Sequence, residues 1–349
     1  MISNRQDQIA GLLLGTAVGD ALGLPAEGLS RQRLARLGWT GRWRHRFLFG
    51  CGMTSDDTEH TILVAETILS SRHDSKAFSR RLAWRLRLWL LAIPAGIGFA
   101  TLRACLKLCI GFSPDKSGIR SAGNGPAMRS AIIGAVFAGD HDKIAEFVRV
   151  STRITHTDPR AETGALAVAL CAESAMLGRS ANETLALLAG SAPEDTEWQE
   201  KLRLVREALE NGWTPIQFCE ALGCPDGVSG YIYHTVPVAV FTFLKATDFR
   251  SGLEEVLDCG GDTDTAGAIA GALLGCRFGA DAIPAEWLAR IVEFPKGTAY
   301  LQHLAGRLDE SALGTSSGGT HSWWLLPVRQ LLFTVVVLLH GFRRLLPPW

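Results

Sequence analysis

Glycine recurs at every fourth position in two apolar segments of this 349-residue chain. The first set is Gly11, Gly15, Gly19 and Gly23, and the second is Gly267, Gly271 and Gly275. In a helix this spacing places the glycines on one face, and each interior glycine costs about 1 kcal/mol relative to alanine. Close approach of another helix is the packing reason that offsets this cost. Both segments are therefore predicted to be helices packed tightly against others.

Apolar residues also recur with helical spacing elsewhere, as from Ile62 to Leu69 and from Ala266 to Leu274. Alternating runs of period two bounded by hairpin dipeptides are hard to find. The β-branched residues lie mostly in alanine-rich and leucine-rich windows, which favours helix. The expected fold is all-α, a single compact multi-helix domain.

The charge balance narrows the classes of function. Hydrophobic residues make up 47% of the chain, and 35 basic residues balance 35 acidic ones, which excludes disordered and collagen-like chains. A protein that grips nucleic acid through its phosphates needs a basic excess or a basic face. Direct binding of nucleic acid is therefore not expected.

The eight cysteines form no CxxC pair, so neither a zinc knuckle nor a disulfide framework is indicated. We expect reduced, mostly buried thiols in a cytoplasmic protein. Near the N-terminus, Asp20 interrupts the apolar stretch, which argues against a cleaved signal peptide.

Two acidic clusters stand at predicted helix starts: TSDDT from Thr54 to Thr58, and GGDTDT from Gly260 to Thr265. A single Ser, Thr or Asp at such a position commonly does no more than cap the helix. Each cluster instead supplies two carboxylates and a hydroxyl. Four like charges brought together would repel unless a cation neutralised them.

An all-oxygen donor set without His or Cys suits Mg²⁺ or Mn²⁺ and fits zinc poorly. If the two helix starts converge, they can hold two such cations, as in other two-metal hydrolytic sites. The predicted metal ligands are Ser55, Asp56, Asp57, Asp262, Asp264 and Thr265.

A third segment, from Ser121 to Arg129, precedes a predicted helix and contains the triplet Gly123-Asn124-Gly125. Its small residues would let backbone N–H groups reach a diphosphate. The same triplet is also a common turn pattern.

Taken together, these segments resemble a known family. They are GLLLGTAVGDALGLPAEG (11–28), TSDDTE (54–59), SAGNGPAMRSAIIG (121–134), ITHTDPRAETGALA (154–167), and GYIYHTVPVAVFTFL (230–244) with GGDTDTAGAIAG (260–271). In this order they resemble the ADP-ribosylglycohydrolases, an all-helical family that includes the dinitrogenase-reductase-activating glycohydrolase and hydrolases of ADP-ribosyl-arginine and ADP-ribosyl-serine.

The resemblance implies a role for each matching position. It places two divalent cations, Mg²⁺ or Mn²⁺, on the six oxygen ligands named above. It makes Asp56 and Glu27 the catalytic carboxylates and Asp20 a supporting one. The implied substrate-binding residues are Ser121, Gly123, Asn124, Gly125, Met128 and His156.

Two positions depart from the family pattern. Ser55 stands where the family usually has Thr, and both residues supply one hydroxyl oxygen. Ala122 stands where the ADP-ribosyl-serine hydrolases place an aromatic residue on adenine, which weakens the match to that branch. Tyr231 or Tyr233 is the alternative we consider for stacking on adenine.

The expected reaction is hydrolysis of the α-glycosidic bond between the C1″ atom of ADP-ribose and an arginine nitrogen. The expected partner is an ADP-ribosylated protein or small molecule. Asp56 is preferred over Glu27 as the carboxylate that balances positive charge at C1″. The alternatives are hydrolysis of O-linked ADP-ribose on serine, nucleic acid or a small molecule, and a non-catalytic ADP-ribose-binding module.

The composition changes towards the C-terminus. We place the catalytic domain at residues 1–310, a flexible Ser/Gly-rich linker at 311–322, and an apolar, tryptophan-rich tail at 323–349. The apolar run of the tail is shorter than the ~20 residues of a membrane span. The tail is expected to pack on the core, to mediate self-association or to lie on a membrane surface.

Overall fold

A computed structural model describes residues 5–312 and 325–346 of the chain. Within these residues the chain is helical, with isolated β-bridges and no β-sheet. The α-helices are α1 (Arg5–Gly23), α2 (Arg31–Arg36), α3 (Asp56–Ser71), α4 (Ser75–Leu91), α5 (Phe99–Cys109), α6 (Pro114–Ser117), α7 (Ala131–Val136), α8 (His141–Arg153), α9 (Pro159–Met176), α10 (Ala181–Ser191), α11 (Thr196–Glu210), α12 (Pro215–Ala221), α13 (Ile232–Lys245), α14 (Phe249–Leu257), α15 (Thr263–Phe278), α16 (Ala285–Leu288), α17 (Thr298–Ala312) and α18 (Leu326–Arg343). Short 3₁₀ turns are η1 (Leu24–Ala26), η2 (Leu48–Gly50), η3 (Ala127–Arg129) and η4 (Ala280–Ala282). The prediction of an all-α domain is confirmed.

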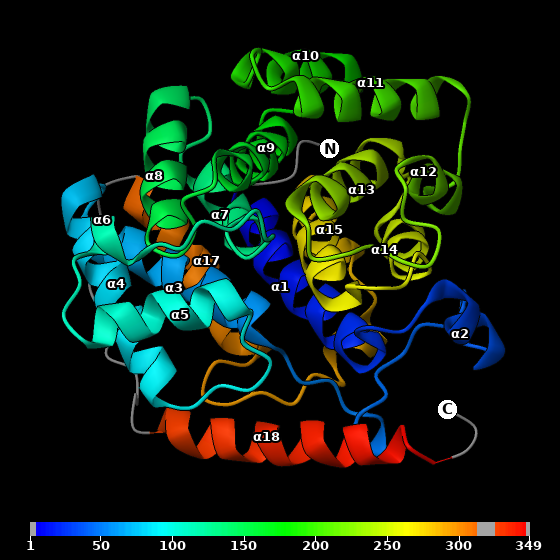
Figure 1. Cartoon of the computed structure of the whole chain (residues 1–349), viewed down its shortest axis with the longest axis horizontal. Helices are drawn as coiled ribbons and strands as arrows, with labels where there is room; N and C mark the ends of the chain where they lie inside the picture. The colour runs from blue at the N-terminus through cyan, green and yellow to red at the C-terminus, as the bar shows by residue number, and fades with distance from the viewer. Residues whose placement is uncertain (1–4, 313–324, 347–349) are drawn as a thin grey trace.

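Helices α1 and α15 lie side by side at the centre of the molecule and run antiparallel (Figure 1). The facing pairs are Gly11 with Gly275, Gly15 with Gly271, and Gly19 with Gly267. A Cβ atom on Gly19 would lie 1.9 Å from the carbonyl oxygen of Gly267, so no side chain fits there. The glycine spacing therefore has the packing role that was predicted for it.

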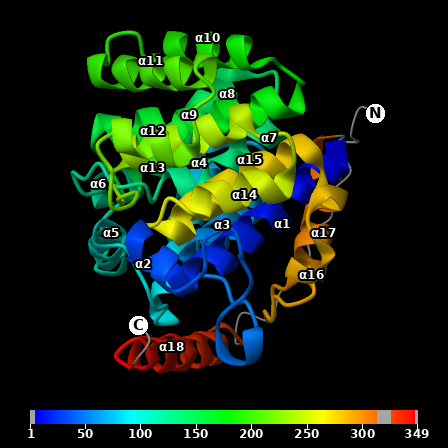
Figure 2. The same ribbon diagram turned by 90° about the vertical axis from the view of Figure 1, so that its right-hand side faces the viewer.

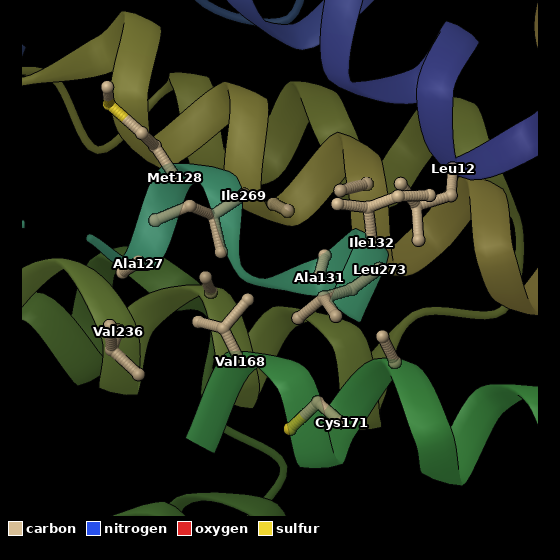
Figure 3. Close-up of a cluster of buried hydrophobic side chains, with 14 of the residues drawn as sticks. Leu12, Ala127, Met128, Ala131, Ile132, Val168, Cys171, Val236, Ile269 and Leu273 are labelled. Atoms are coloured by element: carbon tan, nitrogen blue, oxygen red, sulfur yellow. The ribbon is translucent and has the colours of Figure 1, made fainter. Parts of the chain in front are cut away.

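The remaining helices surround this pair in layers. Helices α10 and α11 form one edge of the molecule, and α18 lies along the opposite edge (Figures 1 and 2). Figure 3 shows the segment from Ala127 to Ile132 lying between α9 and α15, with its apolar side chains in the core. This buried anchor positions the loop that precedes it, Ser121 to Pro126.

All eight cysteines are free, and six of them are buried, as expected for reduced structural thiols. Of the predicted linker, Ser311 and Ala312 end α17, and residues 313–322 lie outside the described residues.

The described part of the tail, α18, packs on the core. Its buried residues are Arg329, Gln330, Phe333 and His340. Phe333 lies in a small cluster with Leu24, Phe47 and Met53. Among the described helices, α1 and α18 have the length and hydropathy of a membrane span, but α1 is 94% buried as a core helix whereas α18 is 22% buried.

Candidate active site

Ser55 and Asp20 shape the first acidic cluster. Ser55 is the N-cap of α3, and its Oγ accepts a hydrogen bond from the backbone N–H of Asp57 at 3.3 Å. Asp20, fully buried in α1, accepts from the backbone N–H groups of Ser55 and Thr58 and from the Thr58 hydroxyl at 2.6 Å. Asp20 thus lies beneath the cluster as a supporting carboxylate.

Gly261 brings the second cluster to the loop that carries Glu27. The N–H of Gly28 donates to the carbonyl of Gly261 at 2.8 Å, and the N–H of Gly261 donates to the carbonyl of Leu29 at 2.8 Å. Gly261 has a φ of +82°, and a Cβ there would lie 2.0 Å from the carbonyl oxygen of Val228. Only glycine suits this junction.

Asp262 occupies the N-cap position of α15, but its side chain makes no capping hydrogen bond. Its Oδ2 instead accepts from Asn124 Nδ2 at 2.6 Å. The backbone N–H of Asn124 donates to the carbonyl of Gly230 at 3.0 Å. The simple capping explanation therefore fails at Asp262, and Asn124 links the glycine loop to the acidic cluster.

The two helix starts converge, although 208 residues separate the side chains that meet. Asp57 Oδ2 accepts from the Ser55 hydroxyl at 3.1 Å and from the Thr265 hydroxyl at 3.3 Å. The positive ends of the α3 and α15 dipoles both point at the acidic side chains, which favours negative charge there.

A pocket of about 530 Å³ opens over this junction. Eleven of the predicted site residues line it: Glu27, Asp56, Ser121, Gly123, Asn124, Gly125, Met128, His156, Asp262, Asp264 and Thr265. Ser55 and Asp57 are buried and lie behind the lining, joined to it by the hydrogen bond from Thr265. The structure thus gathers every predicted site residue in one place.

The carboxylates of this pocket raise one another's pKa. Burial is the main cause for Asp56, Asp57 and Asp264, with repulsion from neighbouring carboxylates adding to it, and each pKa stands well above its ordinary value. Burial also raises the pKa of Asp20 to about 7 and, together with Asp262, the pKa of Glu27. Full ionisation of these carboxyl groups is therefore unfavourable unless a positive charge compensates it.

The donor chemistry of this cluster fits a hard cation. Its side chains offer only carboxylate and hydroxyl oxygens. Asp57 Oδ1 is buried and has no hydrogen-bond partner among the described residues, so one carboxylate oxygen is left for a ligand. In the same part of the chain, no three Asp, Glu, His or Cys side chains already converge as a preformed metal-binding group.

The glycine loop forms another part of the pocket lining and rests on a buried arginine. Arg129 donates to the carbonyl of Gly125 at 3.2 Å, to Thr155 and to Ser151, which holds the loop from beneath. His156 lies against the loop, since a Cβ on Gly123 would be 3.3 Å from its Nε2. Burial, with Arg129 nearby, lowers the pKa of His156 to about 3.

Part of the pocket lining comes from outside the segments singled out in the sequence. Phe99, Thr101 and Ser229 border the pocket but belong to none of the recognised segments. The expectation for the tyrosines is not met: Tyr233 is fully buried with its hydroxyl on Asp195, and neither Tyr231 nor Tyr233 lines the pocket. Phe99, which is mostly exposed at the start of α5, is the aromatic residue at the pocket. No sequence pattern marked it.

Comparison with known proteins places this architecture in a family. The family model described as ADP-ribosylglycohydrolase matches residues 1–317. A solved structure titled "ADP-ribosylglycohydrolase-related protein complex" superposes with a TM-score of 0.66 at 28% identity, covering 88% of this chain and 99% of that one.

Similar sequences come from bacteria, archaea and animals. An uncharacterised protein of Archaeoglobus fulgidus is 31% identical over 87% of this chain and 97% of its own length. The ADP-ribosyl-[dinitrogen reductase] glycohydrolase of Rhodospirillum rubrum is 27% identical over 82% of this chain and 90% of its own. The ADP-ribosylhydrolase ARH3 of Gallus gallus is 26% identical over 79% of this chain and 87% of its own length. With its helical fold and this pocket, the chain belongs to the ADP-ribosylglycohydrolase family.

Proposed function

We propose that the protein hydrolyses the α-N-glycosidic bond of ADP-ribosylated arginine, on a protein or a small molecule, with two divalent cations. The observation that carries this proposal is the meeting of two acidic helix starts at one pocket that a glycine loop also lines. An arginine linkage is preferred because Ala122 replaces the aromatic residue expected for serine-linked substrates. The similarity to the Rhodospirillum rubrum glycohydrolase supports the same reaction class.

The glycine loop is suited to the diphosphate. Gly123 and Gly125 border the pocket without side chains, so a phosphate can approach their backbone closely. The buried Arg129 guanidinium beneath Gly125 adds positive charge on the same side. Phe99 offers a ring for adenine at the pocket edge.

The acidic wall is suited to the ribose and the water. Asp56 lines the pocket at the first turn of α3, where its carboxylate can take a proton from water and balance positive charge that develops at C1″. Glu27 lines the same wall and adds negative charge. The ligands proposed for the cations are Ser55, Asp56, Asp57, Asp262, Asp264 and Thr265. When bound, the cations supply positive charge that orients ribose hydroxyls and acidifies water.

Release of ADP-ribose from two α-linked peptides, one modified on arginine and one on serine, tests the proposal. We expect turnover of the arginine peptide with Mg²⁺ or Mn²⁺, and loss of turnover in EDTA and in Asp262→Ala and Asp264→Ala. Asp142→Ala, which removes an exposed acid from the first turn of α8, is the matched control and should retain activity.

Each alternative gives a different result. Turnover of the serine peptide alone would assign the O-linked reaction. Binding of ADP-ribose without turnover of either peptide would assign a binding module, and full activity in EDTA would exclude the cations. Asp56→Ala should lose turnover by several orders of magnitude but keep measurable affinity for ADP-ribose, because the loop and Arg129 remain.

A further inference from the structure

The outer side of α18 is apolar and has no partner within the described residues. The exposed side chains are Val328, Leu331, Leu332, Val335, Leu338, Leu339 and Phe342, followed by Leu345 and Leu346. They recur at three- and four-residue intervals, so these exposed residues share one side of α18. Figure 2 shows α18 along one edge of the molecule. Leu331 is 67% exposed and Phe342 is 65% exposed. A contiguous apolar face of this kind marks an interaction surface.

An arginine-rich cleft adjoins the C-terminal end of this helix. The cleft has a volume of about 670 Å³. Its lining includes Arg44, Arg46, Arg250, Arg290 and Arg343. The carboxylate among its lining residues, Glu286, forms an ion pair with Arg250. The cleft therefore carries an excess of positive charge.

Arg46 is partly buried in this cleft. Its guanidinium lies 4.0 Å over the Trp39 ring, and its Nε is buried without a hydrogen-bond partner among the described residues. Burial and the nearby Arg44 and Arg343 lower its pKa to about 10. An anion in the cleft would relieve this repulsion.

Direct contacts join the cleft to α18. Arg343, in the last turn of α18, lines the cleft. Phe47, from the loop that follows α2, packs edge-on against His340 at 5.2 Å, and this loop reaches α18 near its C-terminal end (Figure 1). Phe49, in the same loop, is 86% exposed at the cleft. The cleft therefore borders the C-terminal end of the helix that carries the apolar face, and Arg343 belongs to both.

We propose that this surface, the outer face of α18 with the arginine cleft, docks the protein on a bilayer that contains anionic lipids. The apolar side chains would enter the interface between headgroups and acyl chains, and the arginines would meet lipid phosphates. Residues 31–46 contain six arginines and no acidic residue, and residues 325–346 also contain no acidic residue, so nothing on these segments would repel a negative surface.

The composition of α18 favours a bilayer over a second copy of this chain. A two-stranded coiled coil buries a narrow seam and flanks it with charged residues. On α18 the residues beside such a seam would be Leu332 and Leu339 on one side and Thr334 and Gly341 on the other. None of the four is charged. Insertion across the membrane is disfavoured, because Arg329 of α18 is buried in ion pairs with Glu59 and Glu293 of the core. A nucleic acid would match the arginines but not the apolar face.

Sedimentation of the full-length protein with vesicles tests the proposal. We expect binding to vesicles of phosphatidylcholine mixed with phosphatidylglycerol, and at least about tenfold weaker binding to phosphatidylcholine alone. Leu331→Glu and Leu338→Glu should each reduce vesicle binding about tenfold or more, since each replaces an apolar side chain that would be buried in the bilayer by a charged one. Arg44→Glu should reduce it about fivefold or more, and more at low salt than at high salt.

Matched controls lie on the opposite edge of the molecule or at a distance from α18. Leu177→Glu introduces the same charge at an exposed leucine after α9, and Arg206→Glu reverses an exposed charge on α11. Both should bind vesicles like the original chain. Because Leu331 and Leu338 are largely exposed, circular dichroism should show all these variants folded.

Four results would overturn the proposal. One is no sedimentation with anionic vesicles, whether or not the protein binds duplex DNA or RNA instead. The second is a stable dimer that Leu338→Glu converts to a monomer without any vesicle binding. The third is an equal loss of binding in the control variants. The fourth is resistance to alkaline extraction from the vesicles, which would show insertion across the bilayer.

Discussion

Arg329 of α18 donates from Nη2 to the carbonyl of Thr54, the residue directly before the Ser55 cap of α3, at 2.6 Å. The same guanidinium binds both oxygens of Glu293, and Glu293 in turn accepts from the Thr54 N–H at 2.7 Å. A residue from beyond the family match, which ends at residue 317, therefore holds the segment that leads into the acidic cluster.

Arg329→Met should destabilise the protein strongly. The substitution leaves Glu59 and Glu293 without the buried cation that pairs with both, and breaking a buried ion pair costs about 3–5 kcal/mol. Arg203→Met, which breaks an exposed pair with Glu200, should cost less than about 1 kcal/mol. Urea unfolding of both variants measures the difference, and equal stabilities would contradict the role given to Arg329.

Asp20→Asn should lower both stability and turnover. Asp20 accepts from two backbone N–H groups and one hydroxyl, and an amide would turn its NH₂ group towards these donors. We expect a loss of about 1–3 kcal/mol and a lower kcat, because Ser55 loses its support. Asp140→Asn is the control, since Asn replaces Asp well at the N-cap of α8. Unfolding and peptide hydrolysis of both variants are the measurements.

Gly123→Val should weaken ADP-ribose binding by about 100-fold, a cost of about 2.7 kcal/mol. A Cβ at this position already lies 3.3 Å from His156 Nε2 and 3.4 Å from Ser121 Oγ, so larger substituents fill the pocket. Gly123→Ala should therefore show a smaller loss. Calorimetric titration with ADP-ribose ranks the three proteins, and an unchanged affinity in Gly123→Val would remove the loop from the binding site.

Gly19→Ala should destabilise the pairing of α1 with α15 by at least about 1–3 kcal/mol, the usual cost of overpacking. The added methyl would meet the Gly267 carbonyl at 1.9 Å, and backbone cannot move aside as a flexible side chain can. Gly190→Ala in α10 is the control, because no atom lies within 4 Å of its Cβ position. Removing a helical glycine there should be neutral or stabilising by about 0.5–1 kcal/mol. Thermal unfolding distinguishes the two outcomes.

His156 should remain neutral between about pH 5 and pH 8. Burial, with the positive charge of Arg129, holds its pKa at about 3 in the folded state, against an ordinary value of 6.5. Between these two pKa values the unfolded chain binds a proton that the folded chain does not, so this residue's contribution to stability falls as the pH drops below about 6.5. Imidazole NMR shifts check the pKa directly. A titration midpoint near 6.5 would contradict it.

The features that sequence reasoning predicted are those encoded locally. Helical periodicity depends on residues within a few turns of each other, and glycines at four-residue spacing allow one close approach, which α1 and α15 make. The acidic clusters could be recognised at helix starts because several oxygen ligands exceeded what a cap requires. The sequence did not show that the Asp262 side chain leaves α15 uncapped. In the folded chain this side chain accepts a hydrogen bond from Asn124 instead.

The all-α class, the glycine faces and the acidic clusters at two helix starts could be predicted from the sequence, because periodicity and side-chain chemistry act over short stretches of chain. Which distant groups meet depends on the packing of the whole chain. Phe99 lines the pocket, whereas Tyr233 is buried in the core. Arg329 of the tail binds Glu59, which lies 270 residues earlier in the chain. These contacts depend on how the helices pack against one another, and a local pattern of residue types contains no record of that geometry.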